Sequence, residues 1–84
     1  TFSNEVFILV SPTQIRMARA ALKIGVRELA DIAGVNAGTV NRYETEKGGL
    51  QAETRDKLQA ALEARGVSFL PDNGEGAGVR LRRP

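Results

Sequence analysis

The sequence has 84 residues, enough for one small domain, and its 42% hydrophobic and 26% charged residues are typical of a globular chain. It contains no cysteine and no histidine, which excludes disulfides, zinc sites of the usual cysteine and histidine kind, and thiol or imidazole catalysis. The net charge of +2 is too small to indicate nucleic-acid binding by itself. Evidence for such binding must come from the positions of the basic residues.

The first predicted element is a strand at Glu5–Val10, whose sequence EVFILV is rich in β-branched and aromatic residues. The apolar run Val6–Val10 is too short to span a bilayer. Glu5 precedes this run, where a signal peptide would have a basic leader. We therefore expect a cytoplasmic protein without membrane attachment.

Helical periodicity dominates the middle of the chain. Ser11 is a suitable N-cap, Pro12 fits a first helical turn, and Gln14 follows Ser11 at the capping-box spacing. Gly34 and Gly66 are placed as helix stops. Apolar residues recurring at spacings of three and four predict four helices: Thr13–Leu22, Val26–Ala33, Ala37–Glu44 and Gln51–Arg65.

The C-terminal part is predicted to form a β-hairpin. Val67–Leu70 and Val79–Arg82 are the two strands, and the turn-forming residues Pro71–Gly74 follow the first of them. An isolated hairpin is marginal in water, so Glu5–Val10 is a candidate third strand, either within one chain or from a second copy. The predicted organisation is an N-terminal strand in residues 1–12, a helical domain in 13–66, and a hairpin with a basic tail in 67–84.

The pattern between Val26 and Glu44 carries the functional signal. Two short helical segments meet across a glycine-containing turn of about three or four residues, which is the spacing of a helix-turn-helix. Gly34 suits the turn, while Val35 and Val40 fill the space between the helices. Polar or very small residues remain for the outer side of the second helix, where they can enter a major groove: Asn36, Ala37, Gly38, Thr39, Asn41 and Arg42.

From Ile15 to about Leu62 the sequence resembles the Cro- and repressor-like (Xre-type) helix-turn-helix family. The matching residues are Arg19, Ile24–Ala30, Ala33–Asn36 and Thr39–Glu44. The resemblance implies a mostly α, lambda-repressor-like bundle of about four helices that binds double-stranded operator DNA as a homodimer. It also implies a structural ion pair between Arg19 and Glu44. The sequence departs from the family pattern at Val26, where many members have a glutamine, and Arg27 is the candidate to replace its phosphate contact.

The predicted DNA contacts differ in kind. Arg42 is expected to read guanine, Asn41 to read adenine or touch the backbone, and Ala37 to touch a thymine methyl. Asn36 and Thr39 fit phosphate contacts or helix capping, and Gly38 allows close approach. Four basic residues are candidates for phosphate contacts, although charges on short helices are usually solvated: Arg16, Lys23, Arg27 and Lys47.

Apolar residues of the strands are interpreted as strand packing or a dimer interface. They are Val6, Phe7, Ile8, Leu9, Phe69 and Leu81. Arg80, Arg82 and Arg83 either extend the basic surface or protect a strand edge. We expect a transcriptional regulator, most simply a repressor, without cofactor, metal or enzymatic activity; an antitoxin or a protein-interaction module on the same scaffold is the alternative.

Overall fold

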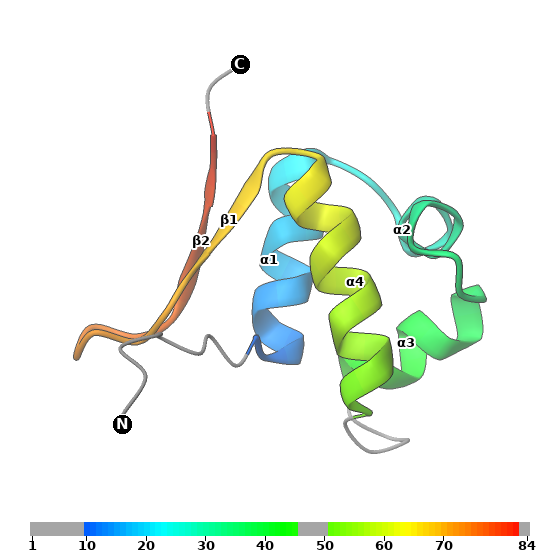
Figure 1. Cartoon of the computed structure of the whole chain (residues 1–84), viewed down its shortest axis with the longest axis horizontal. Helices are drawn as coiled ribbons and strands as arrows, with labels where there is room; N and C mark the ends of the chain where they lie inside the picture. The colour runs from blue at the N-terminus through cyan, green and yellow to red at the C-terminus, as the bar shows by residue number, and fades with distance from the viewer. Residues whose placement is uncertain (1–9, 46–50, 83–84) are drawn as a thin grey trace, which may run out of the picture.

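The computed structural model describes residues 10–45 and 51–82, which form four α-helices and one antiparallel β-hairpin (Figure 1). This confirms the expected mostly helical fold with a C-terminal hairpin. Residues 5–9 of the expected N-terminal strand, and Lys47, lie outside the described ranges. The elements are α1 Pro12–Leu22, α2 Val26–Ala33, α3 Ala37–Thr45, α4 Ala52–Ala64, β1 Val67–Leu70 and β2 Gly78–Leu81.

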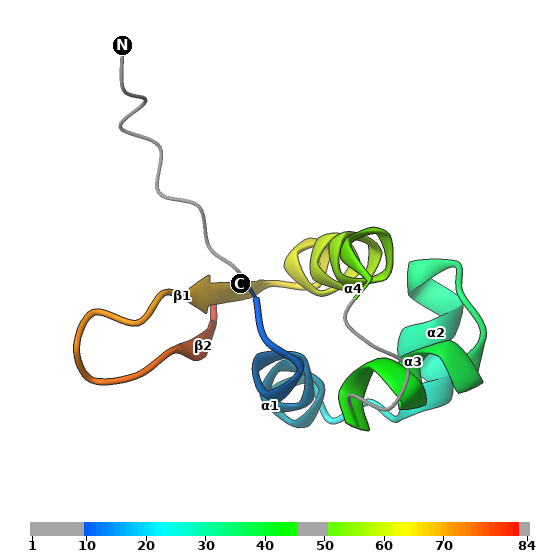
Figure 2. The same ribbon diagram turned by 90° about the horizontal axis from the view of Figure 1, so that it is seen from below.

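Helices α1 and α4 lie side by side in the middle of the molecule, with the hairpin on one side and α2 and α3 on the other (Figures 1 and 2). Every element contributes to a single hydrophobic core between these layers. No helix in the described ranges is long and apolar enough to cross a membrane. The buried core residues are Val10, Ile15, Ala18, Leu29, Ala30, Val40, Tyr43, Leu58, Leu62, Val67 and Phe69.

The first helix begins at the expected capping box. The Ser11 hydroxyl accepts a hydrogen bond from the Gln14 amide at 3.2 Å, and the Gln14 side-chain oxygen accepts one from the Ser11 amide at 3.0 Å. Pro12 occupies the first turn, where no N–H donor is needed. Lys23 ends the helix in the left-handed conformation, with φ of 58°.

The hairpin packs one face on the helices. β1 and β2 are antiparallel, with Val67 opposite Leu81 and Phe69 opposite Val79. Val67 and Phe69 point into the core, and Phe69 is only 4% exposed. The expectation that Phe69 contributes to a dimer interface is therefore corrected, because its side chain is already buried within its own chain. The second strand begins and ends one residue earlier than expected, at Gly78 and Leu81.

The Gln14 side chain joins the first helix to the hairpin. Its amide nitrogen donates to the Leu70 carbonyl at 3.1 Å and to the Gly78 carbonyl at 2.9 Å, and these two residues face each other at the loop end of the strands. Gln14 is 2% exposed, so all of its polar atoms depend on these internal partners. The sequence indicated the cap but not this second role.

Candidate nucleic-acid interface

A tight turn of three residues, Gly34–Asn36, connects α2 to α3. Gly34 has φ of 74°, a left-handed conformation that glycine adopts without strain. The amide of Val35 then donates to the Ala30 carbonyl at 3.0 Å, which closes the end of α2. The chain consequently changes direction at once, and α3 lies against both α2 and α1.

Asn36 caps α3. Its side-chain oxygen accepts hydrogen bonds from the Thr39 amide at 2.7 Å and from the Thr39 hydroxyl at 2.9 Å. Asn36 is exposed and Thr39 half-buried. Capping thus accounts for the Asn36 oxygen, and its amide nitrogen remains the group that can face a ligand.

The outer face of α3 is polar, and Arg42 is the only exposed charged side chain on this helix. Gly38, Asn41, Arg42 and Thr45 are exposed, whereas the helix buries Val40, Tyr43 and Glu44 on its inner side. Ala37 is half-buried and packs against the core. The exposed side of α3 therefore presents amide, hydroxyl and guanidinium groups and no carboxylate.

Arg42 lies back across the first turn of α3. Its Nη2 is 3.5 Å from the Thr39 hydroxyl. A Cβ added at Gly38 would lie 3.3 Å from the Asn36 Oδ1 and 3.5 Å from the Arg42 Nη1. A side chain at Gly38 would therefore crowd the capping oxygen of Asn36 and lie in ordinary contact with the guanidinium.

Helix α1 holds the C-terminal end of α3 through Glu44. Arg19 donates from Nε to one carboxylate oxygen at 2.8 Å and from Nη2 to the other at 2.9 Å. This is the ion pair implied by the family resemblance. The hydrogen bond to Glu44 raises the pKa of Arg19 above its ordinary value, and the nearby charge adds to the effect.

Arg16 has a structural role that the sequence did not indicate. Its Nη1 donates to the Glu44 carbonyl, and its Nη2 donates to the Thr13 hydroxyl at 3.1 Å. A guanidinium that binds the last carbonyls of a helix stabilises the helix C-terminus. Its expected phosphate contact would compete with these bonds. Only tertiary structure brings Arg16 to Glu44, so no local sequence signal could have shown this contact.

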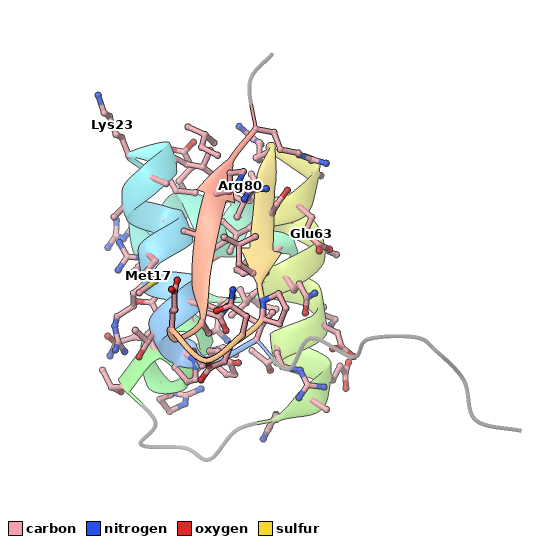
Figure 3. The ribbon with its side chains drawn as sticks, turned by 90° about the vertical axis from the view of Figure 1, so that its left-hand side faces the viewer. Met17, Lys23, Glu63 and Arg80 are labelled. Atoms are coloured by element: carbon pink, nitrogen blue, oxygen red, sulfur yellow. The ribbon has the colours of Figure 1, made fainter. Side chains whose placement is uncertain are left out.

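Two other basic residues that were predicted to contact phosphate, Lys23 and Arg27, lie around the start of α2. Arg27 is exposed in the first turn of α2, and the N-cap Gly25 has no side chain to cap that helix. Lys23 is exposed at the end of α1 (Figure 3). The first amides of α2 and the Arg27 side chain together can accommodate an anion.

The described residues contain no group of three or more acidic side chains placed to hold a metal ion. A comparison with models of known protein families gives no match. A comparison with curated proteins also gives no match.

Proposed function

We propose that this protein is a sequence-specific DNA-binding transcriptional regulator of the helix-turn-helix type, acting as a homodimeric repressor at an inverted-repeat operator. The observation that carries the proposal is the outer face of α3, where Arg42 is the one exposed charge among small and polar residues. A major groove admits an α-helix and presents acceptor pairs that suit such groups. The short turn between α2 and α3 supports the same interpretation.

Each residue has a defined part in this proposal. Arg42 reads a guanine through two parallel hydrogen bonds, and Asn41 contacts an adjacent base or phosphate. Arg27 and the uncapped amides of α2 bind the DNA backbone. The two ion-pairing oxygens of Glu44 keep α3 in a fixed orientation on α1 while it lies in the groove.

Selection of bound sequences from a random DNA pool tests the proposal, followed by affinity measurements on the selected site at several salt concentrations. Arg42→Ala is expected to lose about 1–3 kcal/mol of discrimination at one base pair. Arg27→Ala is expected to weaken binding to all sequences and to reduce the salt slope by about one. The matched control is Arg65→Ala, which removes an exposed arginine from the far end of α4.

Enrichment of no common sequence, or equal binding by wild type, Arg42→Ala and Arg27→Ala, would reject DNA reading by α3. A loss of affinity in Arg65→Ala as large as that in Arg27→Ala would show only nonspecific attraction to a basic protein.

A further inference from the structure

The loop that joins β1 to β2 contains Asn73, the only asparagine in the sequence that is followed by a glycine. The other three asparagines precede glutamate, alanine and arginine. Every residue of the loop, from 71 to 77, is exposed, so water and hydroxide reach both Asn73 and Gly74. This pair combines an electrophilic amide with a neighbouring backbone nitrogen that can attack it.

Gly74 leaves its own amide nitrogen unobstructed. A Cβ added at this position would meet no heavy atom within 4 Å apart from its chain neighbours. A side chain on the residue after an asparagine hinders the approach of that residue's nitrogen to the asparagine side chain, and glycine removes the obstacle. The Gly74 nitrogen and the Asn73 Cγ belong to one chain, at the spacing that closes a five-membered ring. The attack is therefore intramolecular and has the advantage of proximity.

The side chain of Asn73 is held in a way that favours attack on its carbonyl. Its Oδ1 accepts a hydrogen bond from the Glu75 amide at 3.2 Å. Attack on the Cγ places negative charge on this oxygen, and an N–H group that already points at the oxygen stabilises the charge. Because the bond reaches across Gly74, it also turns the side chain along the backbone toward that residue.

Asp72 acts on the nucleophile in the opposite direction. One of its carboxylate oxygens accepts hydrogen bonds from the Gly74 amide at 2.8 Å and from the Gly76 amide at 2.9 Å. The Gly74 nitrogen must lose its proton before it attacks. A carboxylate that binds this N–H disfavours the loss, because it stabilises the protonated form and repels the negative charge that would follow. Asp72 therefore slows the attack, which proceeds when this exposed hydrogen bond opens.

We propose that Asn73 is a site of spontaneous deamidation and that Asp72 limits its rate. Hydroxide removes the proton of the Gly74 nitrogen, which then attacks the Asn73 Cγ. A new C–N bond closes a succinimide ring, and the side-chain nitrogen takes a proton from water and leaves as ammonia. Water then adds to either carbonyl of the ring and opens it. Opening at one carbonyl gives aspartate, and opening at the other gives isoaspartate, in which the main chain runs through the former side chain.

The hairpin is built to tolerate this modification. The Gln14 amide nitrogen binds the Leu70 carbonyl at 3.1 Å and the Gly78 carbonyl at 2.9 Å, so it fixes the strands at both ends of the loop. Isoaspartate adds one carbon to the main chain within an exposed loop, where added length costs little. We therefore expect the modified protein to keep its fold.

The lasting effect of the modification is one of charge. A neutral amide becomes a carboxylate between Asp72 and Glu75, and the formal net charge falls by one from +2. The loop and α3 lie at opposite ends of the molecule (Figure 1). The inference thus goes beyond the proposed function and does not depend on DNA binding.

The test follows the folded full-length protein during incubation at neutral pH. Cation-exchange chromatography measures the loss of positive charge, and peptide mass spectrometry locates the converted residue and separates aspartate from isoaspartate. Asn36 and Asn41 in the same samples are internal controls and are expected to remain unchanged. Circular dichroism checks that each variant is folded.

Two variants of the loop separate the role of the hydrogen bond from that of charge. Asp72→Ala is expected to convert Asn73 about tenfold faster than the wild type does, because a charged acceptor is removed from the Gly74 amide. Glu75→Gln is the matched control, since it removes a neighbouring negative charge but retains the Glu75 amide that binds Asn73. Its rate is expected to lie near that of the wild type.

The expected result is a mixture of aspartate and isoaspartate at position 73 that forms faster in Asp72→Ala. Conversion of Asn73 no faster than that of Asn36 and Asn41, in both the wild type and Asp72→Ala, overturns the site. Aspartate without isoaspartate overturns the ring intermediate. Equal rates in the wild type and Asp72→Ala, or an equal acceleration in Glu75→Gln, overturn the role of the Asp72 hydrogen bond.

Discussion

The carboxylate of Glu44, at the C-terminal end of α3, accepts two hydrogen bonds from the Arg19 guanidinium on α1, at 2.8 and 2.9 Å. Glu44 is 4% exposed, so its carboxylate has been moved out of water, whereas the side chain of Arg19 remains partly exposed. A buried carboxylate depends strongly on such a partner. Arg19 therefore holds the C-terminal end of α3 on α1, together with the bond from Arg16 to the Glu44 carbonyl.

Removing Arg19 is expected to destabilise the protein severely. Arg19→Met leaves the Glu44 carboxylate buried and unpaired, at a cost of about 3 kcal/mol or more in the free energy of unfolding. Arg19→Lys retains the charge but not the two parallel bonds, so an intermediate loss is expected. Chemical denaturation measures both values. The double variant Arg19→Met with Glu44→Leu should be more stable than Arg19→Met alone, and the opposite order would contradict this account.

Gln14 offers a test of the junction between α1 and the hairpin. Gln14→Glu has nearly the same shape but, when ionised, cannot donate to the Leu70 and Gly78 carbonyls. Gln14→Glu is expected to lower the free energy of unfolding more than Gln14→Ala does. Gln14→Ala is expected to lower it by about 1–3 kcal/mol, because it leaves buried polar groups without partners. Hydrogen exchange of the hairpin amides should accelerate in both variants. Unchanged exchange would show that the hairpin does not depend on this side chain.

Gly34 is expected to tolerate no side chain without strain. A Cβ at this position has open space, so the cost of Gly34→Ala arises from its φ of +74° alone and should be about 1–2 kcal/mol. Gly78→Ala is the control: it also has open space, and its φ lies outside the left-handed region. That variant is expected to be neutral or slightly stabilising. Thermal denaturation of both variants compares them directly, and equal losses would exclude backbone strain as the cause.

Gly38→Ala should separate stability from DNA reading. Alanine is a better helix former than glycine, which favours α3 by about 1 kcal/mol. The added Cβ lies 3.3 Å from the Asn36 Oδ1, so this capping side chain must shift by a few tenths of an ångström, and it lies in ordinary contact with the Arg42 Nη1 at 3.5 Å. We expect a folded protein with altered base preference in a binding selection, because the methyl group is added to the exposed side of α3 beside Arg42. An unchanged preference would show that a methyl group at this position does not meet the DNA.

The hairpin loop is expected to respond to acid. Hydrogen bonds from the Gly74 and Gly76 amides lower the pKa of Asp72 below its ordinary value. The carboxylate therefore stabilises the folded state above the pKa of an unfolded aspartate, about 4. This stabilisation is lost as the pH falls through the lower pKa that Asp72 has in the folded protein. NMR titration should show the two glycine amides shifting below pH 4. In Asp72→Asn these shifts should disappear, and their persistence would assign them to another group.

Local sequence signals were sufficient for most of the fold. The capping residue Ser11 and the helix-ending Gly34 gave the boundaries of α1 and α2 to within one residue, because their effects act over a single turn. Alternation in the C-terminal segment gave the hairpin, with the second strand placed one residue late and its register undetermined. The long glycine-rich loop left several registers open, and the Gln14 amide holds the observed one.

The candidate site was less predictable, because its geometry depends on contacts distant in sequence. Gly38, Asn41 and Arg42 are exposed on α3 as expected, whereas Ala37 and Thr39 are half-buried. The Arg19–Glu44 pair followed from the family resemblance. The bond from Arg16 to the Glu44 carbonyl spans 28 residues and has no local pattern. Phe69 was ambiguous for the same reason: an apolar strand residue fits a core or an interface equally well until the opposing helices are placed.

The bridge made by Gln14 has a consequence for how the chain folds during synthesis. Its amide nitrogen is made early, but the two carbonyls that it binds belong to residues 56 and 64 positions later. Until β2 has been made, this amide nitrogen can be satisfied only by water, and burying it would leave a donor without a partner. We therefore expect this side of α1 to lose its water only when both strands of the hairpin are available.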